Sequence, residues 1–510
     1  MTSNIASTAN TTDANDATTA AATVFKCRLN AAFQRPILQT LQQRLQETPR
    51  RMIVVAGPRQ IGKSTLVSQA LDGKFASFIA TDQPDDGRSF EDASESPFGE
   101  GFADPFGNLS DPFAPGDENT PLTPNPIAAK ELRARSSATT RQASAPNDGQ
   151  WLIDHWQKAR EIARNVPAGQ FHILAIDEIQ KIPRWSEIVK GLWDQDRRNN
   201  LPLHIILLGS SPWLIQKGLT ESLAGRYEPI FMSHWSYPEM REAFGFTLDQ
   251  YIYFGGYPEP ATTLADEDRW KRYVLTTLIQ ATIEQDILQM TRIEKPTILK
   301  RLFELGCGTY SGQILALHKI AQDIDGAAHL MTLRHYLDLL SQAKLLTGLQ
   351  KFAREDVRRR ASPPKFNTHN TALVCAQLTT TLTHARQDPE LWGHLVESAV
   401  GAHLINDLPM NCGLYYWREE PHEVDFLLVA GRKIVAIEVK SSPRFKKPKG
   451  LEIFKAKFER NYSIRTLLIG PDLPETSEGQ SLTTSLENFL SQPVQHWING
   501  SGTAGPDQTT

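Results

Sequence analysis

The chain has 510 residues, of which 40% are hydrophobic, and its formal net charge at pH 7 is −4. This length is typical of about three domains, and the nearly balanced charge excludes a general attraction to nucleic acid, which would need a local basic patch. Four scattered cysteines without paired spacing favour a reducing compartment and exclude a disulfide framework or a cysteine zinc site.

The N-terminal segment is polar and carries no basic residue. Residues 1–24 consist mostly of Ser, Thr, Ala and Asn, and they lack the basic start of a signal peptide and the arginines of a transit peptide. We expect a disordered tail here. No later run approaches the ~18 apolar residues of a membrane span, so we expect a cytoplasmic protein with no membrane partner. A helix is predicted next, because Leu38, Leu41 and Leu45 recur at helical spacing.

A glycine-rich motif follows this helix. The apolar run Met52–Ala56 predicts a buried strand, and Leu66–Leu71 predicts a helix. The residues between them match the phosphate-binding pattern Gly-x-x-x-x-Gly-Lys-Ser/Thr. The expected ATP-binding set is Gly57, Pro58, Arg59, Gln60, Ile61, Gly62, Lys63, Ser64 and Thr65.

The chemistry of this motif depends on backbone N–H groups, one lysine and one hydroxyl. The N–H groups of the turn and the helix dipole favour an anion. We expect Lys63 to reach the β- and γ-phosphates of ATP and Ser64 to bind Mg²⁺. The alternative is a chance match in an ordinary strand-to-helix turn.

A second strand is predicted over residues 75–80, and the composition then changes. Residues 84–148 are rich in Pro, Gly, Ser and acidic residues, which predicts a disordered insertion. Short Pro-Phe motifs recur in it after Ser96, Asp104 and Asp111. These motifs are either docking sites for a partner or an accident of low-complexity sequence.

A second motif ends the next predicted strand. A helix is expected from Trp151, and the apolar run that begins at Phe171 ends in Asp177 and Glu178. After a phosphate loop, such an Asp-Glu pair predicts that Asp177 supports Mg²⁺ through water. Glu178 would act as the general base for the attacking water. Alternatively, both acids only cap the segment that follows.

Polar residues after the next strand complete the predicted nucleotide site. A helix is predicted over residues 185–197, and a buried strand over 204–208 ends in Gly209 and two serines. Ser210 or Ser211 is expected to orient water or the γ-phosphate, unless the serines only form a turn or a helix cap. Arg226 would act as a sensor or as an arginine finger in a neighbouring subunit, or would form a surface salt bridge.

The middle of the chain is predicted to be helical. Residues 265–300 carry apolar residues at helical spacing, and two further helices are predicted over 314–324 and 333–340. A strand from Leu345 follows, and this order resembles a winged helix, whose second helix would enter the DNA major groove. Alternatively, the segment serves packing or contacts other subunits. The second helix and its end offer Arg334, His335 and Lys344.

The second chemical signal lies between residues 390 and 470. A helix, three strands, a helix and a strand are predicted in that order. Asp425 lies on the second strand, and Glu438 and Lys440 flank a valine on the third, so their side chains share one face. With Glu397 on the preceding helix, these carboxylates would hold Mg²⁺ beside a scissile phosphate, and the lysine would position water. Alternatively, Glu438 and Lys440 form an ordinary surface pair.

Two features follow these acids in the sequence. A last helix is predicted over residues 482–490, before a polar tail. A basic segment would meet a phosphodiester backbone. Its residues are Arg444, Lys446, Lys447 and Lys449.

In this order, the motifs resemble a large family of bacterial and archaeal AAA-type P-loop ATPases. Its members carry a winged-helix segment and a C-terminal domain like the PD-(D/E)XK restriction endonucleases. The insertion at 84–148 departs from the family pattern. The resemblance rests on Gly57–Thr65, Ile176–Glu178, Gly209–Ser211, Leu223–Arg226 and Phe254–Pro258, and on Asp425, Glu438 and Lys440 for the C-terminal domain.

The resemblance implies an α/β fold in several parts. An AAA-type three-layer domain with a parallel sheet would occupy residues 25–260, and a helical lid and winged helix 261–370. A nuclease-like α/β domain would occupy 371–470, and a helix and polar tail 471–510.

The resemblance also implies a function. We expect a protein that binds and hydrolyses ATP with Mg²⁺ and whose nucleotide state controls the nuclease-like domain. One alternative is an ATP-gated nuclease that acts on DNA or RNA. Another is a nucleotide-dependent protein-interaction switch with an inactive nuclease fold. Nucleic acid and further copies of the chain are the macromolecular partners that this expectation includes.

Overall fold

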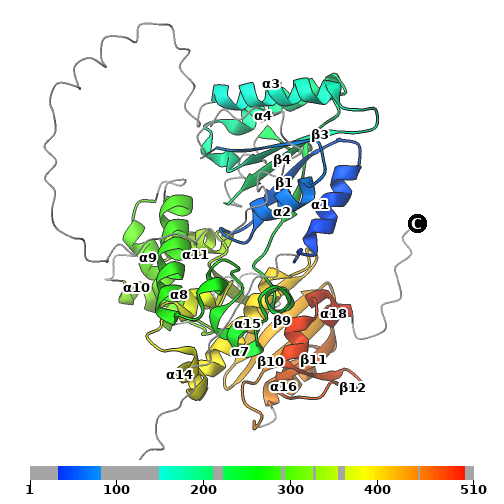
Figure 1. The fold of residues 1–510 in the computed structure, drawn as a ribbon. Helices are drawn as coiled ribbons and strands as arrows, with labels where there is room; N and C mark the ends of the chain where they lie inside the picture. Colours follow the sequence, from blue (N-terminus) through cyan, green and yellow to red (C-terminus); the bar gives the residue numbers. More distant parts are fainter. Residues whose placement is uncertain are drawn as a thin grey trace, which may run out of the picture.

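Two β-sheets with helices packed on them organise the structure (Figure 1). The computed structural model describes residues 33–81, 149–210, 222–288, 293–309, 311–324, 329–353, 362–445 and 448–499. Several predictions fall outside these ranges: the N-terminal tail, the insertion at 84–148, Ser211, Lys446, Lys447 and most of the C-terminal polar tail.

The first sheet contains five parallel strands in the order β2-β3-β4-β1-β5. Apolar runs form its central strands because both faces of a parallel sheet are covered, and every residue of β1 and β4 is buried. The strands are β1 (Met52–Ala56), β2 (Ala76–Ala80), β3 (His172–Asp177), β4 (Leu203–Gly209) and β5 (Tyr227–Phe231).

Helices cover both faces of this sheet and make a three-layer domain. Ile53 and Val55 of β1 share an apolar cluster with residues of α1 and α2, whereas Met52 and Val54 share another with residues of α3 and α4. This alternation follows from the twofold side-chain repeat of a strand. The predicted α/β fold with a parallel sheet is confirmed. The helices are α1 (Ile37–Gln46), α2 (Lys63–Leu71), α3 (Gly149–Asn165) and α4 (Trp185–Arg198).

The strand order decides which segments meet. Because the strands are parallel, their carboxyl ends lie at one edge of the sheet, where ligands of open α/β sheets bind. β4 lies between β1 and β3. The segment that follows β4 therefore lies between the glycine-rich loop after β1 and the two acids at the end of β3.

Two short helices after β5 are absent from the predicted elements. They are α6 (Tyr237–Phe244) and α7 (Leu248–Phe254). Each begins with a capping box, in which Ser236 pairs with Glu239 and Thr247 pairs with Gln250. The spacing of these pairs is a sequence signal for a helix start.

The predicted helical segment at 265–300 is observed in the described residues 267–288 and 296–300, with π-helical hydrogen bonding in the first of these stretches. α8 (Glu267–Tyr273) continues into η4 (Val274–Gln280) and η5 (Thr282–Leu288), whose backbone has π-helical hydrogen bonding. Such bulges are frequent at functional sites. The following helices are α9 (Pro296–Glu304), η6 (Leu305–Thr309), α10 (Leu317–Asp323) and α11 (Leu330–Gln342).

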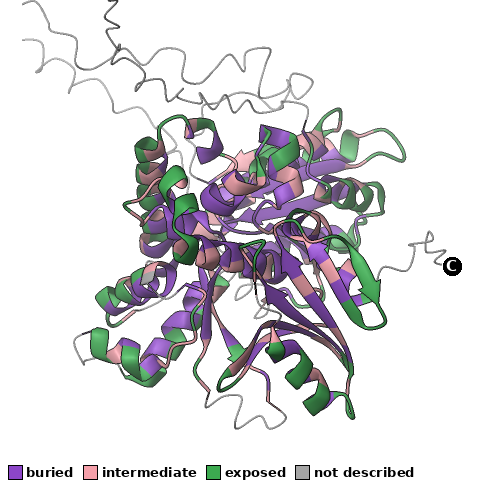
Figure 2. Cartoon of the chain, turned by 90° about the horizontal axis from the view of Figure 1, so that it is seen from below, coloured by how far each residue is buried: buried purple, intermediate pink, exposed green. Residues whose placement is uncertain are grey.

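The second sheet contains eight strands in mixed directions, in the order β12-β13-β11-β10-β9-β8-β6-β7. Val435 and Ile437 of β10 share an apolar cluster with residues of α15, whereas Ile434 and Ala436 share another with residues of α16. Figure 2 shows buried residues along the strands and exposed ones on outer helix faces. The strands are β6 (Leu346–Lys351), β7 (Lys365–Thr368), β8 (Gly413–Glu419), β9 (His422–Ala430), β10 (Lys433–Val439), β11 (Ser463–Gly470), β12 (Thr476–Glu478) and β13 (Ser481–Ser485).

The predicted order of helix, three strands, helix and strand is observed between residues 389 and 470 as α15, β8, β9, β10, α16 and β11. The β6–β7 hairpin joins the same sheet, since Gln350 pairs with Tyr415 and Lys351 with Tyr416. The sheet therefore continues across residue 370, where the sequence predicts a domain boundary. The helices are α13 (Ala372–Cys375), α14 (Leu382–Gln387), α15 (Pro389–Asn406), α16 (Lys449–Phe458), α17 (Leu486–Ser491) and α18 (Val494–Asn499).

The predicted helix over residues 482–490 is wrong in its first part. Ser481–Ser485 form β13, parallel to β11, and Leu482 and Thr484 are buried in alternation with their neighbours, as in a strand. Helix α17 begins only at Leu486, where the Ser485 side chain accepts a hydrogen bond from the N–H of Asn488.

Within the described ranges, no helix combines the length and the apolar character that a membrane crossing requires.

Candidate functional site

The glycine-rich loop joins β1 to α2 in a tightly constrained turn. Gly62 has a left-handed backbone, with φ of 84°, which glycine adopts without steric cost. A Cβ at Gly57 would lie 2.4 Å from the Met232 carbonyl oxygen after β5. These two glycines therefore permit the loop geometry and its close approach to the neighbouring backbone.

Lys63 lies inside this loop. Its side chain is buried, and Nζ donates to the carbonyl oxygens of Gly57, at 3.1 Å, and Pro58, at 2.7 Å. Burial lowers the pKa of Lys63, while the nearby charges of Glu178 and Asp177 oppose that shift. The ammonium is thus held at the centre of the turn, where a bound phosphate would add a further negative partner.

Ser64 connects the loop to the end of β3. Its Oγ donates to Asp177 Oδ2 at 2.6 Å, and Asp177 Oδ1 accepts from the N–H of Glu178 at 2.9 Å. Burial raises the pKa of Asp177. The structure therefore brings together the hydroxyl and the carboxylate that the sequence predicts as Mg²⁺ partners, while Thr65 is the next, exposed residue of α2.

Glu178 and Ser210 meet at the same edge. Ser210 Oγ donates to Glu178 Oε2 at 2.9 Å, and the Gln180 side chain donates to the same oxygen. Glu178 precedes the short helix η2 (Ile179–Lys181), but its side chain makes no cap hydrogen bond there. The capping alternative is therefore not observed for the Glu178 side chain, and its role as general base stays a prediction. Sequence reasoning missed Gln180, which has no motif of its own.

The loop residues Arg59 and Gln60 bind the helical segment. The Arg59 guanidinium forms two hydrogen bonds of 2.6 Å with the carboxylate of Asp286 in η5. Gln60 Oε1 accepts from the Tyr273 hydroxyl of α8 at 2.8 Å. Burial raises the pKa of Asp286, and Arg59 opposes that shift. Asp286 and Tyr273 were missed because each lies more than 200 residues from its partner.

Two residues outside the motif support the carbonyl of Ile61. The Trp235 indole N–H donates to it at 2.9 Å, and an Arg35 guanidinium nitrogen donates at 3.4 Å. Arg35 also forms an ion pair with Glu239 at 2.8 Å. The loop is therefore fixed from three sides: by β5 and the segment after it, by the region before α1, and by the helical segment.

Arg226 lies at the opposite end of the first sheet. It precedes β5, whose last residue, Phe231, pairs with Ala56 at the end of β1. The guanidinium forms a partly exposed ion pair with Asp194 at 2.7 Å. A role of Arg226 at its own chain's nucleotide is therefore corrected to the surface-pair alternative, while a role as arginine finger in a neighbouring subunit stays a prediction.

Three C-terminal residues come together as the sequence predicts. Asp425 Oδ2 accepts from the N–H of Val439 at 2.8 Å, and Lys440 Nζ lies 2.7 Å from Glu438 Oε1. Burial, and then the charge of Asp425, raise the pKa of Glu438. Asp425, Glu438 and Lys440 therefore lie at the junction of β9 and β10.

The predicted metal ligands Glu397, Asp425 and Glu438 each contact a protein group in this structure. Glu397 Oε1 lies 2.5 Å from Nζ of Lys365, a residue that sequence reasoning missed. Among the described residues, no group of three or more His, Cys, Asp or Glu side chains is arranged to hold a metal ion.

The expected DNA-contacting residues differ in exposure. Arg334 and His335 are exposed on α11, whereas Lys344 is only partly exposed. Its carbonyl oxygen lies 3.1 Å from His234 Nε2, and burial lowers the pKa of Lys344.

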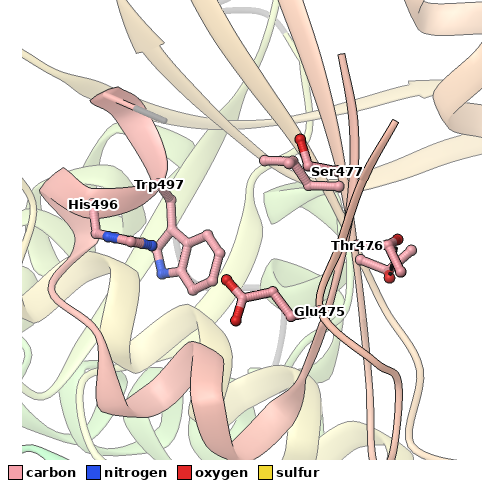
Figure 3. Close-up of a pocket in the computed structure, with 7 residues that line it drawn as sticks. Glu475, Thr476, Ser477, His496 and Trp497 are labelled. Carbon is pink, nitrogen blue, oxygen red and sulfur yellow. Dashed lines mark hydrogen bonds between the residues drawn. The ribbon is translucent and has the colours of Figure 1, made fainter. Parts of the chain in front are cut away.

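A pocket of about 100 Å³ lies between the β12–β13 hairpin and α18. Figure 3 shows His496 and Trp497 of α18 opposite Glu475. The lining residues include none of the predicted site residues. The pocket is thus separate from both candidate sites.

Three family models match parts of the chain. One described as an AAA domain matches residues 135–241, which include Asp177, Glu178 and Ser210. Two described as domains of unknown function match residues 245–383 (DUF8612) and 392–476 (DUF4143). The chain is similar to AAA-type P-loop ATPases. A comparison with curated proteins found no match.

Solved structures overlap with the chain at low identity. The Walker-type ATPase PABY2304 of Pyrococcus abyssi is 15% identical, with a TM-score of 0.41 over 69% of this chain and 97% of that one. A RuvB variant of Thermotoga maritima is 12% identical, with a TM-score of 0.26 over 62% and 89%. The ORC1 protein of Aeropyrum pernix in complex with DNA is 13% identical, with a TM-score of 0.23 over 65% and 87%. The functional argument therefore rests on the geometry of this chain.

Proposed function

We propose that this chain is a Mg²⁺-dependent ATPase whose nucleotide state is passed through its helical segment to the C-terminal domain. One observation carries the proposal: the phosphate loop, the two acids of β3 and the serine after β4 are linked by hydrogen bonds at one sheet edge. Ser64 contacts Asp177, and Ser210 contacts Glu178.

The residues present fit Mg²⁺, which prefers oxygen ligands and is commonly held by few protein groups together with substrate phosphates. The Ser64 hydroxyl and the Asp177 carboxylate would hold it. When bound, the ion would neutralise charge on the β- and γ-phosphates.

The chain's own residues supply the remaining chemistry. Lys63 would bind the β- and γ-phosphates from within the loop. Glu178 would accept a proton from the attacking water, and Ser210 and Gln180 would hold the Glu178 carboxylate in place. General base catalysis of this kind contributes roughly 10²–10⁴-fold in rate.

Substitution of two residues tests this assignment. We expect Lys63→Ala to abolish ATP binding, because the loop loses its cation. We expect Glu178→Gln to bind ATP but to hydrolyse it at least ~100-fold more slowly, because an amide accepts no proton. Nucleotide titration and steady-state phosphate release measure the two effects. Robust turnover by Glu178→Gln would refute the role given to Glu178.

Contacts of the loop supply the route for the nucleotide state. Arg59 and Gln60 belong to the loop that binds phosphate, and they contact Asp286 and Tyr273 of the helical segment. A change of loop geometry would alter both contacts. The helical segment would then act as the lid that the sequence predicts.

The lid also contacts the segment that leads into the C-terminal domain. Lys271 Nζ of α8 donates to the carbonyl oxygen of Thr380 at 2.7 Å, and Glu267 accepts from the N–H of Leu382 at 3.2 Å. α14 and α15, which carries Glu397, follow this segment. The proposed route therefore runs from the loop through α8 to α15.

A second candidate function is an ATP-gated nuclease. The order α15-β8-β9-β10-α16-β11 and the contact of Asp425 with β10 favour a nuclease-like domain, and α10, α11 and the β6–β7 hairpin have the order of a winged helix. Incubation of DNA and RNA with the protein, ATP and Mg²⁺ or Mn²⁺ tests it. Absence of cleavage, or cleavage that Asp425→Ala leaves unchanged, would exclude this candidate.

The remaining alternative is a nucleotide-dependent interaction switch whose nuclease fold is inactive. ATP-dependent association with further copies of the chain, without cleavage, would favour it. The position of Lys365 among the C-terminal acids supports this alternative.

A further inference from the structure

Lys365 is a charged residue in a fully buried position. It is the first residue of β7, at the edge of the second sheet, and its side chain has an exposed fraction of 0%. Removing an ammonium group from water costs several kcal/mol unless other charges compensate. The surroundings of Lys365 must therefore explain why this position carries a lysine.

Acidic groups surround the Lys365 ammonium. Its Nζ lies 2.5 Å from Glu397 Oε1, 3.8 Å from Glu423 Oε1 and 3.9 Å from Asp425 Oδ1. Nζ also donates to the carbonyl oxygen of Asp425 at 3.1 Å and lies 4.7 Å from the ring centre of Phe426. One ammonium thus contacts acids from both α15 and β9.

The Lys365 side chain is therefore the shared basic partner of Glu397, Glu423 and Asp425.

The expected metal ligands are already engaged by protein groups. Glu397 contacts Lys365, Asp425 accepts from the N–H of Val439, and Glu438 contacts Lys440. Of the carboxylate oxygens of these three acids, which the structure describes, only Glu438 Oε2 is buried without a hydrogen-bond partner. The residues present do not fit a divalent cation, because Lys365 lies beside Glu397 and Asp425 and Lys440 lies beside Glu438.

We propose that Lys365 is a built-in cation that takes the place of the divalent metal in the nuclease-like acid cluster. It joins the β6–β7 hairpin to α15 and β9 by charge, and it makes the cluster independent of metal ions. The inference does not depend on the ATPase assignment, since it concerns a separate site.

The proposal and the metal-site alternative predict opposite signs for one substitution. If Lys365 neutralises the acids, Glu397→Gln removes its nearest partner and lowers the melting temperature of the metal-free protein by about 5 °C or more. If the acids instead await a metal, they repel one another, and Glu397→Gln raises the melting temperature. Glu390→Gln, at an exposed position of the same helix, is the matched control and should change little.

The full-length wild-type chain provides the second measurement. In a Mn²⁺ titration without nucleotide, we expect the wild type and Asp425→Asn to bind the same amount of Mn²⁺. A Lys365→Met, Glu397→Gln double variant should lose less stability than the sum of the two single changes, because both remove the same ion pair. Mn²⁺ binding that depends on Asp425, or a melting temperature that Glu397→Gln leaves unchanged or raises, would overturn the proposal.

Discussion

The hydrogen bond from Ser210 to Glu178 is a single contact of the candidate ATPase site to which a chemical role can be proposed. Its side chain is buried at the end of β4, and its hydroxyl donates to Glu178 Oε2. A carboxylate that acts as a base must be held where the attacking water binds. Ser210 and Gln180 both donate to that oxygen, so we propose that Ser210 positions Glu178.

This geometry predicts the effect of removing the hydroxyl. We expect Ser210→Ala to lower kcat by roughly 10-fold, because one hydrogen bond to a charged group is worth about 1.5–3 kcal/mol and Gln180 retains the other. ATP affinity should change little, since the phosphate contacts remain. Steady-state kinetics and nucleotide titration separate the two effects, and Ser210→Thr, which keeps the hydroxyl, is the control. An unchanged kcat in Ser210→Ala would show that Ser210 does not support Glu178 in catalysis.

At the scale of elements, strands with continuous apolar runs could be predicted from the sequence. β1, β3 and β4 agree with the prediction to within one residue at each end. β5 was missed because it is an edge strand that contains Pro229 and is mostly not buried. β13 was predicted as helix because Leu482 and the apolar residues of α17 are also spaced as in a helix.

The residues of the two candidate sites likewise fall into those that the sequence predicts and those that it does not. Lys63 and Ser64 lie in one contiguous motif, and Asp177 and Glu178 lie in another. Each motif can be recognised from the sequence because its chemistry fixes the local spacing. Asp286 contacts Arg59 across 227 residues of sequence, and no local pattern marks such a pair. Lys365 lies outside the predicted nuclease-like domain and reaches it only because the β6–β7 hairpin joins the sheet. Long-range packing therefore decides the part of the site that the sequence does not reveal.

The strands β3 and β4 also predict a pH dependence of stability. His172 and His204 begin or nearly begin these strands, and burial lowers the pKa of each to about 4, from 6.5. Both histidines are therefore neutral in the folded protein, while the unfolded chain gains protons below pH 6.5. Above pH 6.5 the two histidines do not change the free energy of unfolding with pH. As the pH falls from 6.5 towards 4, each of them lowers the free energy of unfolding by about 1.4 kcal/mol per pH unit at most.

Replacement of one histidine isolates this effect. We expect the urea midpoint of His204→Leu to decline less than that of the wild type between pH 7.5 and pH 5, because the variant has one fewer group to protonate on unfolding. His318→Leu, at an exposed position on α10, is the control and should follow the wild type. Equal declines in wild type and His204→Leu would show that burial of His204 does not govern acid sensitivity.

At the scale of the whole molecule, the helical segment contacts both the phosphate loop and the segment that leads into α15. It contacts the phosphate loop through Asp286 and Tyr273, and it contacts residues 380–382 through α8. A second connection bypasses it, since the hydroxyl of Tyr237 in α6 donates to Glu487 of α17 at 3.0 Å. Coupling between distant sites needs an element that both sites bias. The helical segment contacts the phosphate loop directly and the C-terminal domain through residues 380–382, which precede α15.

The ion pair between Arg59 and Asp286 is the contact that should carry this coupling. In the wild type, we expect a non-hydrolysable ATP analogue to change amide hydrogen exchange in α8 and in α15. Asp286→Asn keeps the shape of the side chain but removes its charge, so the change should remain at the loop and weaken several-fold in α15. Glu284→Gln is the matched control, because Glu284 lies in the same π-helical segment and pairs with Lys300 at a partly exposed position. If the analogue alters α15 equally in wild type and Asp286→Asn, the nucleotide state reaches the C-terminal domain by another route, of which the Tyr237–Glu487 contact is the first to test.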